Sequence, residues 1–280
     1  MNDDSVHGGE FEAHAGDPSA APRRPLRRGI YILPNLFTLA ALFGGFYAIV
    51  MAMNDRFDLA VIGVFCALVL DSLDGRVARM THTQSAFGEQ MDSLADMVSF
   101  GAAPALVVYE WALRGLGKLG WIAAFVYCSG AALRLARFNT NIGIVDKRYF
   151  QGLPSPAAAA IVAGFIWVVD DAGVRDVAKI DGLAWTAFAV TLYAGLTMVT
   201  NAPFYSFKDV SFKRSVPFIV IVLIALGIAV INIHPPIVLF GLFCAYGVSG
   251  YAVYAYRKMK GKPVSVIATS TDEPDERGLH

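Results

Sequence analysis

The sequence predicts an all-α membrane protein: a polytopic bundle of about eight transmembrane helices with both termini in the cytoplasm. Its composition points this way, because 56% of the 280 residues are hydrophobic and only 16% are charged. An ordinary soluble domain is less apolar than this. The apolar residues also gather into long runs, and about 20 helical residues cross the ~30 Å hydrocarbon core of a bilayer.

Each long apolar run is expected to be a helix, because lipid cannot satisfy free backbone polar groups. The predicted spans lie near residues 33–53, 58–78, 89–112, 119–138, 155–171, 183–204, 215–233 and 236–256. Residues 1–28 are expected to form a disordered tail that ends in basic residues, without a cleavable signal peptide. Residues 29–257 would then be the transmembrane domain, and residues 258–280 a flexible tail.

Positive charges are distributed unevenly between the two sides of this predicted bundle. With the N-terminus in the cytoplasm, 17 Lys and Arg residues fall on the cytoplasmic side and 5 on the other, including Lys147 and Arg148 among the 17. Such asymmetry sets membrane orientation, so it favours an even number of spans. The net charge is zero, and we expect no nucleic-acid partner.

The three cysteines are not expected to carry chemistry. Cys66, Cys128 and Cys244 each lie inside an apolar run, and their spacing gives no metal-binding pattern. We expect small core or lipid-facing residues at these positions.

Four aspartates lie where the second span ends and the third begins. Asp71 and Asp74 are three residues apart, Asp92 and Asp96 are four apart, and both spacings place the pair on one helix face. The second span descends to the cytoplasm and the third leaves it, so all four should meet near the cytoplasmic interface. Their repulsion would require protons or cations among them.

An all-oxygen cluster without His or Cys suits hard cations such as Mg²⁺, Mn²⁺ or Ca²⁺. Two such ions would make a site for a diphosphate. Two alternatives stay open at this point. The aspartates could be solvated carboxylates paired with Arg76 and Arg79, or part of an ion pathway through the membrane.

The aspartates belong to a longer pattern that resembles the signature of the CDP-alcohol phosphotransferase family at every fixed position. The pattern reads Asp71-x-x-Asp74-Gly75-x-x-Ala78-Arg79, eight residues, then Gly88-x-x-x-Asp92-x-x-x-Asp96. The resemblance implies a helical membrane enzyme, usually a homodimer, with a cytoplasm-facing site for two divalent ions, Mg²⁺ or Mn²⁺.

The resemblance also implies roles for the residues of the signature. Asp71, Asp74 and Asp92 would be metal ligands, and Asp96 would be both a ligand and the general base for the incoming alcohol. The remaining signature positions would shape the pocket for the cytidine nucleotide; they are Gly75, Ala78, Arg79 and Gly88.

Three further stretches resemble the bacterial membrane-embedded phosphatidylserine synthases of that family. They are RGIYILPNLFTLAALFGGFYAI at 28–49, LRLARFNT at 133–140 and YFQGLPSPAAAA at 149–160. This resemblance implies an enzyme of the bacterial inner membrane that transfers the phosphatidyl group of CDP-diacylglycerol to L-serine and releases CMP. Glycerol 3-phosphate as the acceptor and, more remotely, a cation transporter are the alternatives.

Residues near the fourth span are candidates for binding the acceptor. Arg134 and Arg137 share a helix face, and an arginine offers a planar bidentate fork to a carboxylate such as that of serine. A glycerol phosphate would need cations too, and interfacial snorkelling is the alternative for both arginines. Gln151 and Ser155 lie in a turn-rich loop that either caps the acceptor pocket or restarts a helix.

Two polar residues at the start of the first span complete the candidate site. Asn35 and Thr38 are either a helix cap or polar contacts to the nucleotide, as in the resembled family. The expected partners are therefore CDP-diacylglycerol, L-serine, membrane lipids and a second copy of the chain.

Overall fold

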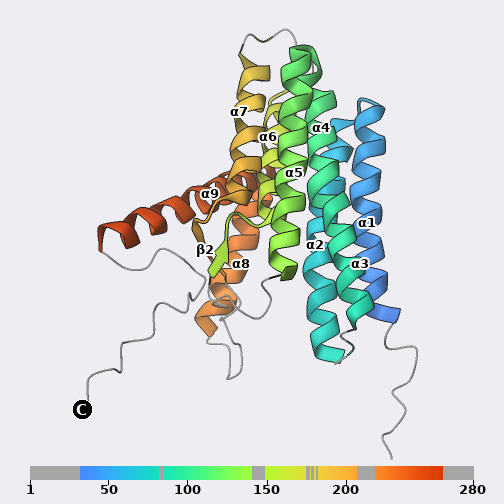
Figure 1. Cartoon of the computed structure of the whole chain (residues 1–280), viewed down its shortest axis with the longest axis vertical. Coiled ribbons are helices and arrows are strands. Elements are labelled where there is room, and N and C mark those ends of the chain that lie inside the picture. Colours follow the sequence, from blue (N-terminus) through green and yellow to red (C-terminus); the bar gives the residue numbers. More distant parts are fainter. Residues whose placement is uncertain are drawn as a thin grey trace, which may run out of the picture.

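The computed structural model describes residues 32–81, 83, 85–140, 149–174, 177, 180, 182–206 and 218–260. The predicted tail 1–28, the basic residues Lys147 and Arg148, and residues 261–280 lie outside the described residues. Within the described part the protein is a bundle of long helices, so the all-α membrane bundle is confirmed (Figure 1).

The helices follow the predicted spans closely. The first two are α1 (Ile32–Met53) and α2 (Phe57–Thr81). A third, interrupted helix consists of α3 (Ala86–Asp96), the π-helical segment η2 (Met97–Ala102) and α4 (Ala103–Trp111). The later helices, with a short 3₁₀ turn η3 (Leu113–Leu116) before them, are α5 (Lys118–Thr140), α6 (Ser155–Asp171), α7 (Leu183–Val199), α8 (Phe218–Ile233) and α9 (Pro235–Met259).

Among the residues that the structure describes, four helical segments are long and apolar enough to cross a membrane. They are Pro34–Met53, Ala86–Trp111, Lys118–Thr140 and Pro235–Met259. Helix α7 is apolar but shorter, and α2 carries charged side chains from Asp71 to Arg79. The number of spans and the side on which each terminus lies stay predictions.

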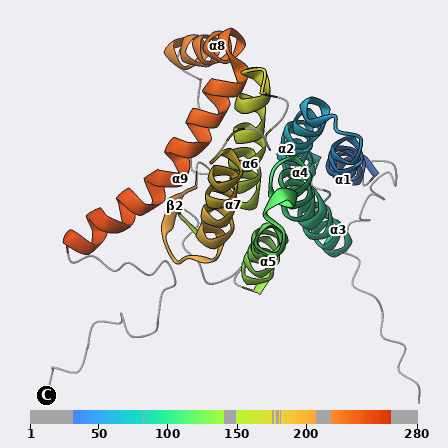
Figure 2. The same ribbon diagram turned by 90° about the horizontal axis from the view of Figure 1, so that it is seen from above.

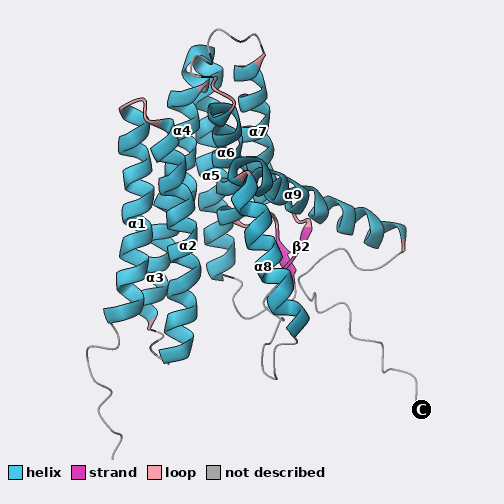
Figure 3. Ribbon diagram, turned by 180° about the vertical axis from the view of Figure 1, so that it is seen from behind, coloured by secondary structure: helices cyan, strands magenta, loops and turns pink. Residues whose placement is uncertain are grey.

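One predicted span is too long. Residues 183–204 were expected to be one helix, but α7 ends at Val199 and Thr200 is extended. Pro203 explains the early end, because proline disfavours helical backbone in the residue before it. Pro203–Tyr205 instead forms strand β2, which pairs antiparallel with β1 (Tyr149–Gln151) in a short ribbon that the sequence did not predict (Figure 3).

Small residues bring the helices of the bundle into close contact. A Cβ added at Gly44 of α1 would lie 3.0 Å from the carbonyl oxygen of Gly63 of α2, so these two backbones touch. Gly130 of α5 and Gly195 of α7 make a similar contact. Close packing of this kind holds helices together in lipid, where burial of apolar surface gives no driving force between them.

The helix directions bring several chain segments to one end of the bundle. Helix α2 ends and α3 begins at this end, with a short connection between them, and both helices pack against α1. The start of α1 and the end of α5 lie at the same end (Figure 1). Helix α9 runs obliquely outward from the bundle, with α8 packed against it (Figure 2). The candidate site residues lie at the end shared by α1, α2 and α3.

Candidate active site

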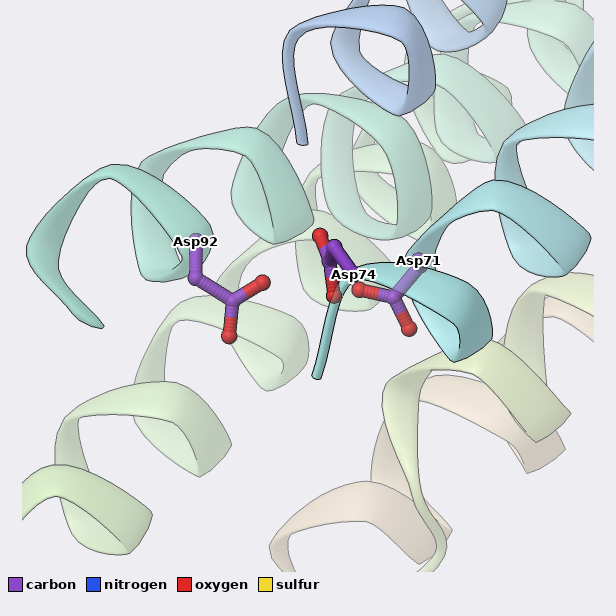
Figure 4. Close-up of side chains that lie close together, drawn as sticks. All are labelled: Asp71, Asp74 and Asp92. Carbon is purple, nitrogen blue, oxygen red and sulfur yellow. The ribbon is translucent and has the colours of Figure 1, made fainter. Parts of the chain in front are cut away.

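Three of the four aspartates form a compact acidic cluster. Asp71 and Asp74 come from α2 and Asp92 from α3, and their side chains are directed toward a common space (Figure 4). One carboxylate oxygen of each lies within 4.8 Å of the other two. The helical spacings in the sequence predicted this convergence.

Asp96 extends the cluster by one helical turn toward α5. Its carboxyl group interacts with those of Asp71 and Asp92. Among the described residues, none of the four carboxylates lies within 4.0 Å of a Lys or Arg nitrogen. Pairing with Arg76 and Arg79, which was the alternative for solvated carboxylates, is therefore not seen.

The donor set of this cluster fits a hard divalent cation. It consists of carboxylate oxygens alone, held by two helices at distances that one small ion could bridge. Asp74 is buried, so its negative charge would be costly without a positive partner. The residues present thus match the metal chemistry that the sequence predicted.

An open pocket adjoins the acidic cluster and is lined by α1, α2, α3 and the connection before α3. All six predicted nucleotide-binding residues line it: Asn35, Thr38, Gly75, Ala78, Arg79 and Gly88. Asp74 and Asp92 form its boundary with the cluster, so a diphosphate in the cluster could extend into this pocket. The resemblance had grouped these six residues by role, and the fold brings them together in space.

The pocket also has lining residues that the sequence analysis did not single out. They are Pro34, Thr83, Ser85 and Glu89. Ser85 is the N-cap of α3, and its Oγ accepts a hydrogen bond of 3.0 Å from the Gly88 N–H. Serine is a preferred N-cap residue directly before a helix, so Ser85 could have been found from sequence.

Thr38 holds one of the aspartates. Its Oγ1 donates to Asp74 Oδ2 at 2.9 Å and also contacts the Pro34 carbonyl oxygen at 3.2 Å. The Thr38 side chain is 4% exposed, so it has little surface to offer a nucleotide. The structure therefore gives Thr38 a contact with the acidic cluster that neither sequence interpretation included.

The two glycines of the pocket differ in what their missing side chains allow. A Cβ at Gly88 would lie 3.2 Å from Ser85 Oγ and 3.4 Å from Asn35 Oδ1, so a side chain would crowd the junction of α1 and α3. A Cβ at Gly75 would meet only Arg79, at an ordinary 3.5 Å. Gly75 thus leaves backbone open to the pocket, where a ligand can approach closely.

Arg134 lies near Asp71 and Asp96, the two aspartates that do not line the pocket. Its Nη1 donates to Ser155 Oγ at 2.6 Å, and its charge interacts with Asp71, Asp96 and Tyr246. Ser155 is fully buried at the first turn of α6. An arginine whose guanidinium donates to a buried serine is not snorkelling to an interface, so that alternative does not describe Arg134.

Arg137 and Gln151 take a different position. Arg137 donates to the end of α7, through Nη2 to the Val199 carbonyl at 2.9 Å and through Nη1 to Asn201 Oδ1 at 3.3 Å. Gln151 Nε2 donates to the same Asn201 oxygen at 2.9 Å. The four predicted acceptor residues therefore divide. Arg134 and Ser155 lie by the aspartates, while Arg137 ties α5 to the end of α7 and Gln151 ties the ribbon to Asn201.

The turn-rich loop before α6 does restart a helix. Pro154 is the N-cap residue of α6, and Ser155 and Pro156 follow in its first turn. Gly152 has a positive φ of 78°, and a Cβ there would collide with the Met198 carbonyl, so the loop turns tightly against α7. Tyr246 and Asn201, which the sequence analysis did not select, join this side of the site through contacts distant in sequence.

The fold and the site define a helical membrane protein with an all-carboxylate cluster beside an open pocket. The family model for CDP-alcohol phosphatidyltransferase matches residues 31–200, and the chain belongs to this family. The match spans α1 to α7 and so contains all four aspartates, the pocket and Arg134. The protein is therefore a phosphotransferase.

Curated relatives agree with this assignment. A CDP-diacylglycerol–serine O-phosphatidyltransferase of Helicobacter pylori is 36% identical over 220 residues, which cover 78% of this chain and 90% of the relative. The protein of that name from Methanocaldococcus jannaschii is 30% identical over 225 residues, 80% of this chain and 96% of the relative. The protein of that name from Mycobacterium leprae is 37% identical over 153 residues, about half of each chain.

Proposed function

We propose that the protein is a CDP-diacylglycerol–serine O-phosphatidyltransferase, which makes phosphatidylserine and CMP from CDP-diacylglycerol and L-serine. The observation that carries this proposal is the position of the acidic cluster between two differently equipped sides. A pocket for a nucleotide adjoins Asp74 and Asp92, and a cationic side chain, Arg134, faces Asp71 and Asp96. A donor and an acceptor could therefore meet at the aspartates.

The acidic cluster would hold two divalent ions, Mg²⁺ or Mn²⁺. Asp71, Asp74 and Asp92 are the proposed ligands, with Asp96 as a further ligand. Bound there, the ions would neutralise the diphosphate of the CDP-lipid and make its phosphorus more electrophilic. Thr38 keeps the Asp74 carboxylate in place through its 2.9 Å hydrogen bond.

The pocket beside the cluster would take the cytidine nucleotide. Arg79 supplies positive charge there, Asn35 supplies hydrogen-bonding groups, and Gly75 and Gly88 leave room for the ligand against the backbone. With the nucleotide in this pocket, the phosphorus that bears the lipid would lie toward Asp71 and Asp96. This is the side on which Arg134 lies.

Asp96 is the proposed general base. It would take the proton of the serine hydroxyl, whose oxygen attacks the phosphorus bonded to the diacylglycerol moiety. The bond from that phosphorus to the bridging oxygen of CMP breaks, and CMP leaves with the electron pair. Arg134 would bind the serine carboxylate through its guanidinium, with Ser155 fixing the guanidinium orientation.

The acceptor is tested by CMP release from CDP-diacylglycerol with purified protein in detergent. We expect release that depends on L-serine and on Mg²⁺ or Mn²⁺, with little release when glycerol 3-phosphate replaces serine. Release with glycerol 3-phosphate alone would transfer the proposal to that acceptor. Metal flux through protein-containing liposomes without any CDP-lipid would instead support the transport alternative.

The role of Asp96 is tested by Asp96→Asn, which keeps the size of the side chain but cannot accept the proton. We expect transfer to be lost while Mn²⁺ still raises the thermal unfolding temperature, because three ligands remain. Asp58→Asn is the matched control, since Asp58 lies at the far end of α2 beside Arg56. Full activity of Asp96→Asn would refute the proposed base.

We also propose a place and an assembly for the enzyme. The excess of Lys and Arg on one side supports a bacterial inner-membrane protein whose active site faces the cytoplasm. We propose a homodimer because members of the family are usually homodimers. Labelling of single cysteines placed near Glu89 in intact cells tests the side of the membrane that the active site faces. The mass of the protein in detergent tests the homodimer.

A further inference from the structure

The third helix is interrupted directly after the proposed base. Residues Met97–Ala102 form a π-helix, in which the Ala103 N–H bonds to the Val98 carbonyl five residues earlier. Such segments are rare, usually one turn long, and frequent at functional sites. In an unbroken α-helix Asp96 and Ala103, seven residues apart, would share a face. The extra residue of a π turn rotates them apart by about 100°.

A proline explains why the helix widens here. Pro104 has no N–H, and its ring disfavours a normal α-helical approach to the carbonyl of residue 100. The Phe100 carbonyl therefore lacks its usual backbone donor. Phe100 is fully buried in an apolar helix, where a free carbonyl is costly because lipid offers no hydrogen bond.

A buried tyrosine from another helix supplies the missing donor. The hydroxyl of Tyr127 on α5 donates to the Phe100 carbonyl oxygen at 3.0 Å, and Tyr127 is 0% exposed. The ring has no solvent-facing atoms, so the hydroxyl's partner is this carbonyl within the bundle. The π turn is thus tied to α5.

A second contact ties the same turn to α1. Ser99 Oγ donates to the Ala41 carbonyl oxygen at 3.0 Å. Gly45 allows this approach, because a Cβ there would lie 2.6 Å from Ser99 Cα. Two hydrogen bonds therefore hold the π turn. One runs from the Tyr127 hydroxyl of α5 to the Phe100 carbonyl, and the other from the Ser99 hydroxyl to the Ala41 carbonyl of α1.

We infer that Tyr127 is a positioning residue for the acidic cluster, holding the π turn that aims Asp92 and Asp96 of α3 at the α2 aspartates. The π turn lets α4 keep its buried face, with Val107, Val108 and Trp111 in the core, while α3 is rotated to face α2. The importance of this rotation for catalysis rests on the proposed roles of the aspartates. The geometry of the π turn itself does not depend on those roles.

The inference is tested first with Tyr127→Phe, which removes only the hydroxyl. We expect kcat to fall on the order of tenfold or more, because small displacements of catalytic groups have effects of this size. The Mn²⁺ concentration for half-maximal activity should rise, and the KM for CDP-diacylglycerol should change little. Tyr251→Phe is the matched control: its hydroxyl bonds to Thr197 at 2.9 Å between α9 and α7, away from the π turn.

Pro104→Ala separates positioning from stability. Alanine restores an N–H that can bond to the Phe100 carbonyl and so favours an unbroken α-helix. We expect thermal stability in detergent to be equal or higher while kcat falls, an opposition that a merely structural role would not produce. The inference would be overturned if the activity of both variants simply followed their stability. It would also be overturned if Tyr127→Phe kept the wild-type kcat and the wild-type Mn²⁺ concentration for half-maximal activity.

A readout without substrate keeps this inference distinct from the proposed function. Mn²⁺ should raise the unfolding temperature of the wild type and of Tyr251→Phe more than that of Tyr127→Phe. If the wild type released no CMP with any alcohol, the proposed function would fail, yet this difference would still support the positioning of the aspartates. An equal Mn²⁺ effect in all three proteins would count against it.

Discussion

The two sides of the acidic cluster are assembled in different ways. The proposed nucleotide side is formed by α1, α2 and α3, and most of its residues lie between Asp74 and Asp92. The proposed acceptor side is formed by α5, α6 and α7. Its hydrogen bonds join residues far apart, 21 positions for Arg134 with Ser155 and 62 for Arg137 with Val199. One side is thus specified by local spacing, and the other by tertiary packing.

This difference predicts how substitutions on the two sides will behave. On the nucleotide side, residues contact the proposed substrate or the aspartates directly, so their loss should affect chemistry. On the acceptor side, neighbouring residues of the same type have separate tasks, as Arg134 and Arg137 show. On the acceptor side, we therefore expect some substitutions to weaken substrate binding and others to lower stability.

Among the substitutions that compare the two sides, the largest effect is expected in the acidic cluster itself. Asp74→Asn should lower kcat on the order of a hundredfold to a thousandfold, because a charged group that stabilises the transition state is lost. CMP release with saturating substrates measures the effect. Asp58→Asn, on the same helix but outside the cluster, should keep wild-type activity. Comparable losses in both variants would mean that α2 charge in general, rather than the cluster, matters.

The comparison within the acceptor side comes next. Arg134→Gln should raise the KM for serine by about tenfold to a hundredfold, the equivalent of a charged hydrogen bond of about 1.5–3 kcal/mol. Arg137→Gln should mainly lower the thermal stability, because the last carbonyls of α7 lose their donor.

Steady-state kinetics in serine and thermal unfolding in detergent distinguish the two arginines. The division of the acceptor side breaks down if Arg137→Gln raises the KM for serine as much as Arg134→Gln does. The division is supported if Arg134→Gln changes only the KM for serine and Arg137→Gln changes only the thermal stability.

The smallest expected effect concerns Thr38, on the nucleotide side. Thr38→Val removes the hydroxyl that holds Asp74 and should lower kcat by about fivefold, in line with a net hydrogen bond of about 1 kcal/mol. Thr38→Ser keeps the hydroxyl and should retain most of the activity. Equal activities of the valine and serine variants would show that the contact with Asp74 has no part in catalysis.

The same difference explains what could be predicted from sequence. Hydrophobic runs located every described helix to within a few residues, because span length is set by the bilayer. The i, i+3 and i, i+4 spacings placed Asp71, Asp74 and Asp92 together, because helix geometry is local. Four of the six pocket residues, Gly75, Ala78, Arg79 and Gly88, followed from the signature, since it lies on two consecutive helices. Asn35 and Thr38 lie outside it, on α1.

Other features depend on contacts that no local pattern contains. Arg134 and Arg137 share a helix face, and only packing of α6 and α7 decides which of them meets the aspartates. The ribbon pairs segments more than 50 residues apart through three residues each. The π turn was not predicted either, although Pro104 within an apolar span is a signal for a local break.

The short length of α6 has a consequence for the surrounding lipid. A helix of 17 residues is about 26 Å long, shorter than the ~30 Å hydrocarbon core. Lipid next to a short helix adapts by thinning locally. The membrane surface would then lie closer to the first turn of α6, where Ser155 is buried within the protein. Bilayer thickness, which depends on acyl-chain length, would then affect how easily a lipid substrate and a water-soluble substrate reach the same aspartates.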